Sequence, residues 1–282
     1  MSRVVICHYH IFKNAGTTFE KVLDDNYGDQ HLKFDGPFSY FNITQDQLVN
    51  IIDRNPDKLA FSSHQIHIPT PTAINFTVVP VVFLRHPILR IRSIFLFGEK
   101  SKQQQAEASM AAEDVVVDDD PLARFADWVE ASMQDRNRRL TLSNAQTNML
   151  CRQYNQAPRV RDRKGRLEYD LYTAIRNIES IPCLGRTEHF DRDTESFAAT
   201  FQRFGVAFQY TPTEPQNVSS SDARLPVEQQ LENLRNRLTP ELWQALLEIN
   251  NQDLELYEVG NALVEKRLEE NWTPTLPRHF GQ

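Results

Sequence analysis

The stretch that decides the fold is VVICHYHIFKNAGTTFEKVL, residues 4–23. It begins with a short apolar run that predicts a buried strand and ends with helical spacing that continues to about Tyr27. A turn of mostly small residues lies between them and opens into the helix. Free backbone N–H groups at such a helix start bind phosphate and sulfate readily. We therefore predict an anion-binding loop here. The residues assigned to it are Lys13, Asn14, Ala15, Gly16, Thr17 and Thr18.

This loop differs from the nucleoside-triphosphate sequence G-x-x-x-x-G-K-[ST], in which the lysine follows the second glycine. Here Lys13 precedes Gly16 by three positions, and the first glycine of the long loop is missing. Thr17 is a counterpart of the magnesium-binding hydroxyl. The order of lysine and glycine nevertheless argues against an ordinary ATP kinase.

The segments that follow predict the rest of a sheet. Residues 58–64 (KLAFSSH) and 76–84 (FTVVPVVFL) have the composition of buried strands. Helical spacing appears after Thr44, a plausible N-cap, and again from Pro87. Strand, helix, strand, strand, helix in this order predicts an α/β, three-layer, P-loop-like fold with a central parallel sheet flanked by helices.

We expect residues 1–282 to form a single domain. The helical pattern dissolves at residues 100–120, where we predict a mobile insertion that is either a surface loop or a lid over the site. An amphipathic helix is predicted behind Pro121, and a late core strand within residues 179–190. Residues 221–270 are predicted to be a helical C-terminal part.

Composition limits the classes of function. The chain is 40% hydrophobic, which is enough for a real core, and carries a formal net charge of −7 with a pI of about 5.7. A general nucleic-acid binder usually presents a basic face, so this balance argues against one. An anionic ligand must be held by a few placed cations rather than by the overall field.

Cysteine usage and hydropathy bear on the compartment. Cys7, Cys151 and Cys183 are widely spaced and odd in number, so we expect reduced thiols rather than a disulfide framework or a zinc site. No apolar stretch approaches the roughly twenty residues of a membrane span, and no signal-peptide pattern is visible. We expect a cytoplasmic protein, although an enzyme separated from a membrane anchor would look similar.

The segment HIFKNAGTT, residues 10–18, resembles the 5′-phosphosulfate-binding loop of sulfotransferases that use 3′-phosphoadenosine 5′-phosphosulfate. It is most similar to the carbohydrate branch, such as heparan sulfate 2-O-sulfotransferases, where the loop is commonly H-x-P-K-T-G-G-T-S. The matching positions are His10, Lys13, Gly16 and Thr17, with Thr18 as a conservative replacement. The departures are Phe12, Asn14 and Ala15. Because alanine lacks glycine's freedom at positive φ, we expect an altered turn.

A second segment, LRHPILRIRS at residues 84–93, resembles the 3′-phosphate-binding pattern L-R-[DN]-P-x-x-R-x-x-S of the same family. Arg85 and Ser93 fall in register, while His86 replaces the usual Asp or Asn. Arg85 follows the carboxyl end of a central strand, where open α/β sheets place ligands and a guanidinium can bind phosphate bidentately. A structural salt bridge would explain Arg85 alone equally well. Two such signatures with correct order and spacing favour the phosphate site.

Four shorter segments also resemble the family, although core packing explains each one as well. They are SNAQTNMLC (143–151), LGRTEHFDRD (184–193), NVSS (217–220) and NNQDLELYE (250–258).

The resemblance implies in-line transfer of SO₃ from a phosphate leaving group to an acceptor hydroxyl. Charge develops on the bridging oxygen, and we assign Lys13 to stabilise it. The loop N–H groups with Thr17 or Thr18 would bind the sulfonate and 5′-phosphate. No metal is required, and no metal-ligand spacing is visible in the sequence.

A hydroxyl acceptor also needs a general base, and a histidine's ordinary pKa near 6.5 suits that role. His64 follows a predicted strand at a location where related enzymes often carry a Gly-His pair, although Ser63 replaces the glycine. His67 is the alternative base, and a hydrogen-bonding turn histidine is the structural explanation of His64.

The acceptor is expected to be a saccharide or glycoconjugate. The sequence does not distinguish a polysaccharide from a glycolipid, a small glycoside or a hydroxylated metabolite. Basic groups at residues 135–139 and 159–166 suit an acidic saccharide, but a solvated surface explains them equally. The sequence does not fix the oligomeric state. Two other functions stay open: a divergent P-loop kinase, and a non-catalytic nucleotide-binding protein of the same fold.

Overall fold

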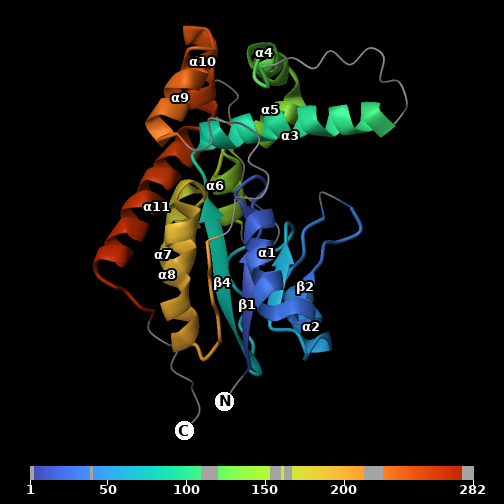
Figure 1. Cartoon of the computed structure of the whole chain (residues 1–282), viewed down its shortest axis with the longest axis vertical. Helices are drawn as coiled ribbons and strands as arrows, with labels where there is room; N and C mark the ends of the chain where they lie inside the picture. Colours follow the sequence, from blue (N-terminus) through green and yellow to red (C-terminus); the bar gives the residue numbers. More distant parts are fainter. Residues whose placement is uncertain are drawn as a thin grey trace.

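The computed structural model describes residues 3–38, 41–108, 120–152, 160–161, 167–212 and 225–274. At its centre is a five-stranded sheet in the order β2-β3-β1-β4-β7, with every neighbouring pair parallel (Figure 1). Its strands are β1 (Arg3–Tyr9), β2 (His31–Lys33), β3 (Ala60–Ser63), β4 (Phe76–Leu84) and β7 (Cys183–Arg186). A separate antiparallel pair joins β5 (Val160–Arg161) to β6 (Leu167–Glu168).

Helices cover both faces of this sheet, which confirms the predicted α/β layers. One face is covered by α1 (Gly16–Tyr27) and α8 (Phe190–Arg203), which follows a 3₁₀ turn, η3 (Thr187–His189). Phe19 of α1 and Phe197 of α8 pack in one buried cluster with alternate side chains of β1 and β4. This alternation is expected of strands that bury both faces.

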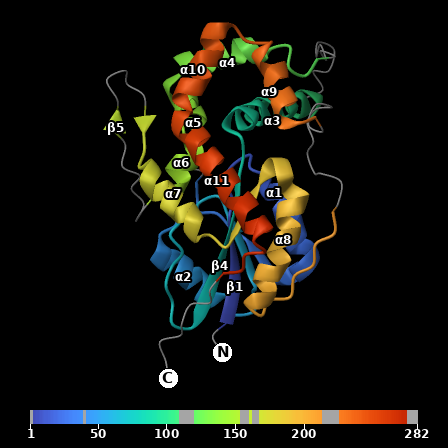
Figure 2. The same ribbon diagram turned by 90° about the vertical axis from the view of Figure 1, so that its left-hand side faces the viewer.

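The opposite face is covered by four helices. They are α2 (Gln45–Arg54), α6 (Ala145–Leu150), α7 (Leu171–Ser180) and α11 (Asn251–Glu269). In Figure 2, α2, α6 and α7 lie on the other side of the strands from α1 and α8, and α11 crosses in front. α2 begins at the predicted N-cap. Thr44 Oγ1 accepts a 3.1 Å hydrogen bond from Gln47 N, and Thr44 N donates to Gln47 Oε1 at 2.8 Å. This reciprocal capping box fixes the start of the helix.

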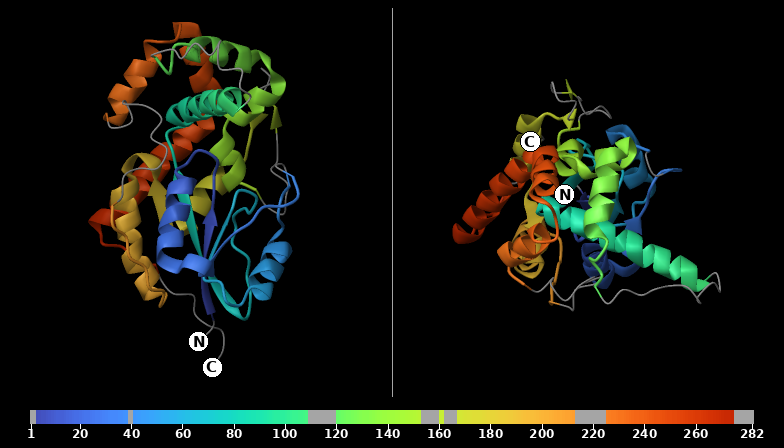
Figure 3. Two further views of the ribbon diagram at one scale, coloured as in Figure 1. Left: turned by 45° about the vertical axis from the view of Figure 1, so that its right-hand side comes forward. Right: turned by 90° about the horizontal axis from the view of Figure 1, so that it is seen from above.

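A helical cap lies above the carboxyl edge of the sheet (Figure 3). It consists of α3 (Pro87–Ala108), α4 (Phe125–Gln134), α5 (Arg136–Leu142), α9 (Val227–Arg235) and α10 (Pro240–Ile249). Leu89, Phe95, Phe125, Val129 and Leu246 belong to its fully apolar cluster. No helix within the described ranges is both long and apolar enough to cross a bilayer.

Two predicted boundaries need correction. α3 continues to Ala108. The first part of the insertion that we expected at 100–120 is therefore helix. The sequence SKQQQAEA (101–108) lacks apolar periodicity but consists largely of strong helix formers, which explains the extension. Residues 109–119 lie outside the described part of the chain. The helix expected directly behind Pro121 begins at Phe125.

The strand order predicts where a ligand would bind. After β1 the chain continues toward the β2 edge, and after β4 it continues toward the β7 edge. Ligands of open α/β sheets bind outside the carboxyl ends of two such neighbouring, diverging strands. The two predicted anion-binding segments follow β1 and β4 directly.

Candidate functional site

The loop between β1 and α1 turns through left-handed conformations at two residues. Lys13 has φ 67° and Ala15 has φ 59°, on either side of Asn14. Ala15 is the N-cap of α1 and supplies no side-chain cap. The N–H groups of residues 16–18 therefore have no intrahelical partner. Together with the positive end of the helix dipole, they form a cradle for an anion.

Two threonine hydroxyls stand beside these N–H groups. Thr17 is exposed and Thr18 is half-buried. Across the described ranges neither hydroxyl makes a hydrogen bond. Both hydroxyls therefore keep their hydrogen-bonding capacity at the start of α1.

Gly16 is required by the close approach of His10 to the loop. A Cβ at position 16 would lie 1.9 Å from the His10 ring. The ring is held in place because its Nδ1 lies 2.9 Å from Glu20 Oε1. Its face stacks on His64 with ring centroids 3.8 Å apart. The glycine thus serves a packing need, whereas the positive φ falls on Ala15.

Arg85 joins the second predicted segment to the loop. Its Nη1 donates to the Lys13 carbonyl at 2.9 Å. Its side chain is 16% exposed, and its Nε lies 3.9 Å from Glu188 Oε1. Burial lowers the pKa of Arg85 although Glu188 opposes this. Nε is buried without a hydrogen-bond partner among the described residues. The guanidinium therefore holds the loop with Nη1, while its Nε is buried on the side of Glu188.

Asn14 and Gln146 lock the loop to the end of β4. Asn14 Nδ2 donates to Phe83 O at 2.8 Å and to Gln146 Oε1 at 2.7 Å. Gln146 also accepts from Arg85 N at 2.9 Å and donates to Arg85 O at 2.8 Å. Asn14 is fully buried. We expected Asn14 to contact the donor, but its side chain lies beneath the loop and supports it.

Arg90 supports the loop from α3. It is almost fully buried, and its Nε donates to Phe12 O at 3.0 Å. Its Nη1 lies 3.4 Å from Thr141 O. Burial lowers the pKa of Arg90 to about 10. Ser93 lies three residues later, on the same side of α3, is half-buried, and makes no hydrogen bond to the described residues.

Lys13 is enclosed by aromatic rings and other cations. Its Nζ lies 4.2 Å from the centroid of the Phe97 ring and 5.7 Å from that of Phe12. Burial, with smaller contributions from Arg85 and Lys100, lowers the pKa of Lys13 to about 8. Within the described residues no carboxylate pairs with this ammonium group. Electrostatics at this point favour an added anion.

His64 is held as a base would be. Its Nδ1 lies 3.1 Å from Asp35 Oδ2, and its backbone N donates to Asp35 Oδ1 at 3.0 Å. Ser63 Oγ donates to the same Oδ1 at 2.8 Å, so the serine that replaces glycine helps to fix the carboxylate. Burial, followed by the charge of His10, lowers the pKa of His64. The side chain is 41% exposed, so the ring is partly open to solvent.

His67 belongs to a different network. Its Nε2 lies 2.9 Å from Asn42 Oδ1 and 3.2 Å from Arg152 Nη1. Its Nδ1 is buried without a partner in the described chain. Burial and Arg152 lower the pKa of His67 to about 3. Of the two histidines considered as the base, His64 has the suitable surroundings.

Two buried carboxylates hold the site together and were missed in the sequence. Glu188 Oε1 accepts from His86 N at 3.1 Å. Asp253 accepts from Gln146 N at 3.0 Å and from Thr147 N at 2.7 Å, which satisfies the start of α6. Both residues lie within the short family-like segments. The sequence therefore contained these two carboxylates in family-like segments, but it did not show which backbone groups they bond to.

Three potential metal ligands lie behind the loop: His8, His10 and Glu20 have ligand atoms within 4.8 Å of one another. The rings of His8 and His10 stack at 5.1 Å with an interplanar angle of 20°. Stacked imidazoles direct their lone pairs along parallel planes rather than toward one ion. His10 Nδ1 already bonds to Glu20, so this trio is best described as packing that positions the loop.

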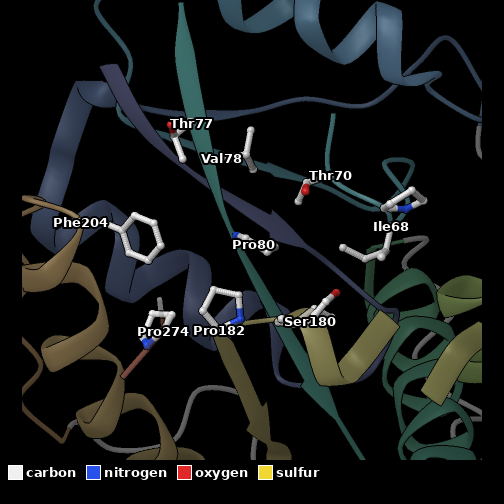
Figure 4. A pocket seen from close by; sticks show the side chains of 11 residues that line it. Ile68, Thr70, Thr77, Val78, Pro80, Ser180, Pro182, Phe204 and Pro274 are labelled. Atoms are coloured by element: carbon white, nitrogen blue, oxygen red, sulfur yellow. The ribbon is translucent and has the colours of Figure 1, made fainter. Parts of the chain in front are cut away.

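Other candidate features lie elsewhere. A pocket of about 210 Å³ lies beside the amino-terminal half of β4, where it is lined by Thr77, Pro80, Pro182 and others (Figure 4). It contains none of the predicted site residues. The basic group at 135–139 opens α5, with Asp135 as its N-cap. Residues 162–166 and the family-like segment at 217–220 lie outside the described ranges.

Two comparisons with known proteins cover most of the chain. A family model described as the sulfotransferase family matches residues 2–258. An uncharacterized protein of Archaeoglobus fulgidus is 24% identical over 265 residues, which is 92% of this chain and 96% of that protein. The family match includes the loop after β1, the segment after β4 and both buried carboxylates.

Proposed function

Because this chain belongs to the sulfotransferase family, we propose that it transfers a sulfuryl group from 3′-phosphoadenosine 5′-phosphosulfate to a hydroxyl of a carbohydrate-like acceptor. The observation that carries the proposal is the 2.9 Å hydrogen bond from Arg85 Nη1 to the Lys13 carbonyl. It joins the two segments that resemble the 5′-phosphosulfate and 3′-phosphate sites. One nucleotide can therefore span both.

The residues at the site fit a donor with several negative charges. The N–H groups of residues 16–18 lack intrahelical partners, and the Lys13 ammonium group pairs with no carboxylate among the described residues. The pKa of Lys13 is lowered to about 8 by burial and neighbouring cations. A bound anion would satisfy these donors and raise the pKa of Lys13 back toward its ordinary value.

In the donor, the sulfur is joined to the 5′-phosphate through a bridging oxygen. This sulfur–oxygen bond breaks as the acceptor oxygen forms a new bond to sulfur. The products are adenosine 3′,5′-bisphosphate and a sulfate ester. Lys13 is assigned to the negative charge that develops on the bridging oxygen. Thr17 or Thr18 and the loop N–H groups bind the sulfonate and 5′-phosphate. Arg85 and Ser93 bind the 3′-phosphate.

The acceptor's proton needs a base on the opposite side of the sulfur. We assign it to Nε2 of His64, which becomes positively charged as it takes the proton. Asp35 holds Nδ1 at 3.1 Å, which fixes the ring and stabilises the resulting imidazolium. The lowered pKa of His64 keeps this ring neutral and ready at neutral pH.

A thermal-shift comparison tests the donor assignment. Adenosine 3′,5′-bisphosphate should stabilise the protein by about 2.7 kcal/mol at a hundredfold excess over its Kd, whereas ATP with magnesium should do much less. Preference for ATP with magnesium would favour the kinase alternative. Nucleotide binding without transfer from labelled donor to any panel acceptor would favour a non-catalytic protein.

Two variants at Arg85 refine the test. Arg85→Ala should weaken binding of adenosine 3′,5′-bisphosphate by about 2–5 kcal/mol, because a desolvated charged anchor is lost. Arg85→Lys should lie between it and the wild type, since it keeps the charge but loses the planar fork. Equal affinity in all three proteins, measured by calorimetry, would remove Arg85 from the donor site.

A further inference from the structure

A groove of about 390 Å³ lies between α2 and the segment that follows β2. Both elements are seen at the right-hand side of Figure 1. Its volume is within the range of small-molecule sites, about 300–1,000 Å³. Phe34, Phe41, Ile43 and Ile51 form its apolar wall. All but Ile43 are half-buried, so the groove presents hydrocarbon and aromatic surface to solvent. Asn50 is exposed and forms part of the rim.

The groove shares a residue with the proposed base. Asp35 lines the groove, and its Oδ2 lies 3.1 Å from His64 Nδ1. The His64 ring stacks on His10 at 3.8 Å, and His10 packs against Gly16 at the start of the donor cradle. An unbroken series of contacts therefore runs from the donor loop through two imidazole rings to the groove.

This adjacency indicates what the groove holds. A hydroxyl positioned at His64 Nε2 belongs to a molecule whose remaining part must extend away from the donor loop. On the Asp35 side, that part meets phenyl and isoleucine side chains. Apolar surface of this kind gains free energy by covering hydrocarbon or aromatic groups, and gains little from a uniformly hydroxylated sugar.

We propose that this groove is the acceptor subsite for an apolar group, and that the acceptor is a glycoside carrying a hydrocarbon or aromatic aglycone. The assignment rests on the proposed function, because it takes His64 as the base that receives the acceptor's proton. It distinguishes a small amphipathic glycoside or glycolipid from a purely polar polysaccharide chain.

The test uses alkyl glucosides of increasing chain length as probes of the groove. Methyl, butyl, hexyl and octyl β-glucosides are titrated by calorimetry into the protein saturated with adenosine 3′,5′-bisphosphate, below micelle-forming concentrations. Each methylene that enters the groove should tighten binding by up to about fourfold, from about 0.8 kcal/mol per buried CH₂. Arms with an aryl glucoside and with a free alkyl alcohol separate the contributions of aglycone and sugar.

Two matched variants on α2 locate the alkyl chain. Asn50→Trp places a large side chain at the rim of the groove and should abolish the dependence on chain length. Asp46→Trp makes the same change at an exposed position of α2 outside the groove, and should keep the wild-type dependence. Neither residue belongs to the donor site, so both variants should bind adenosine 3′,5′-bisphosphate as the wild type does.

The outcomes separate this inference from the proposed function. If the wild type did not bind adenosine 3′,5′-bisphosphate, the proposed function and the subsite would both be refuted. If the nucleotide bound but glucoside affinity did not rise with chain length, the subsite alone would be overturned. The same holds if Asn50→Trp kept the full dependence.

Discussion

Replacement of Lys13 by methionine should disable the enzyme and at the same time stabilise the ligand-free protein. The change from 10.5 to about 8 in the pKa of Lys13 corresponds at face value to roughly 3 kcal/mol. Lys13 is only half-buried, and solvent screening reduces the usable figure to about 1 kcal/mol. Methionine keeps the length of the side chain and a favourable contact with Phe97, which offsets the lost cation–π interaction.

The pH dependence identifies the ammonium group as the cause. The folded-state pKa is below the unfolded one, so the unfolded chain binds more protons between about pH 8 and 10.5. The destabilisation by Lys13 is therefore complete below pH 8 and is relieved as the pH rises toward 10.5. Wild type and Lys13→Met should differ by about 1 kcal/mol at pH 7, or roughly 2 °C in Tm, and should converge at pH 10.5.

Chemical unfolding of both proteins across this pH range measures the difference, and transfer from labelled donor measures activity. Transfer should fall by about 100- to 1,000-fold or more, as when one preorganised charge is removed from a transition state. A variant that is no more stable than the wild type at pH 7, or a gap that does not narrow at high pH, would refute the account of Lys13 as a strained cation.

Three further changes have defined outcomes. Ala15→Gly should raise the free energy of unfolding by about 1 kcal/mol, because φ 59° is left-handed; lower stability would show that the turn does not strain the alanine. Gly16→Ala should cost about 1–3 kcal/mol by overpacking against the ring of His10; if adding His10→Ala recovered none of the loss, that ring would not be the cause. His64→Gln should lower transfer at least about 100-fold while the affinity for adenosine 3′,5′-bisphosphate is unchanged. In the wild type the acid limb of the rate profile should fall below pH 6.5, the ordinary pKa of histidine, because burial lowers the pKa of His64; a midpoint above 6.5 would contradict a neutral base.

The sheet was predictable because its central strands are continuous apolar runs with clear boundaries. This pattern predicts β1 and β4, and Thr44 marks the start of α2. β2 was missed because His31–Lys33 is only three residues long and has no apolar pattern. The start of α7 could also have been predicted from the sequence. Asp170 Oδ1 accepts from Thr173 N at 2.9 Å, an N-cap directly before an amphipathic segment.

Sequence patterns single out the residues that we propose to contact a ligand, but not the residues that support them. Lys13 and Arg85 lie in short local patterns, so one sequence suffices to single them out. The pairing of Asp35 with His64 spans 29 residues, and that of Gln146 with the Arg85 backbone spans 61. Such contacts are set by how strands and helices pack, which local spacing does not encode.

The arrangement around the donor loop explains why so many of its side chains hold the protein rather than a ligand. Two residues at positive φ and three desolvated cations around the loop each cost stability in the absence of an anion. The loop keeps its shape because Asn14, Arg85 and Arg90 fasten it to three other parts of the chain: the end of β4, α6 and the start of α3. Arg85 differs from the other two, since it fastens the loop and is also assigned to the 3′-phosphate. Loss of Arg85 should therefore affect loop order and donor affinity together, whereas loss of Ser93 should affect donor affinity alone.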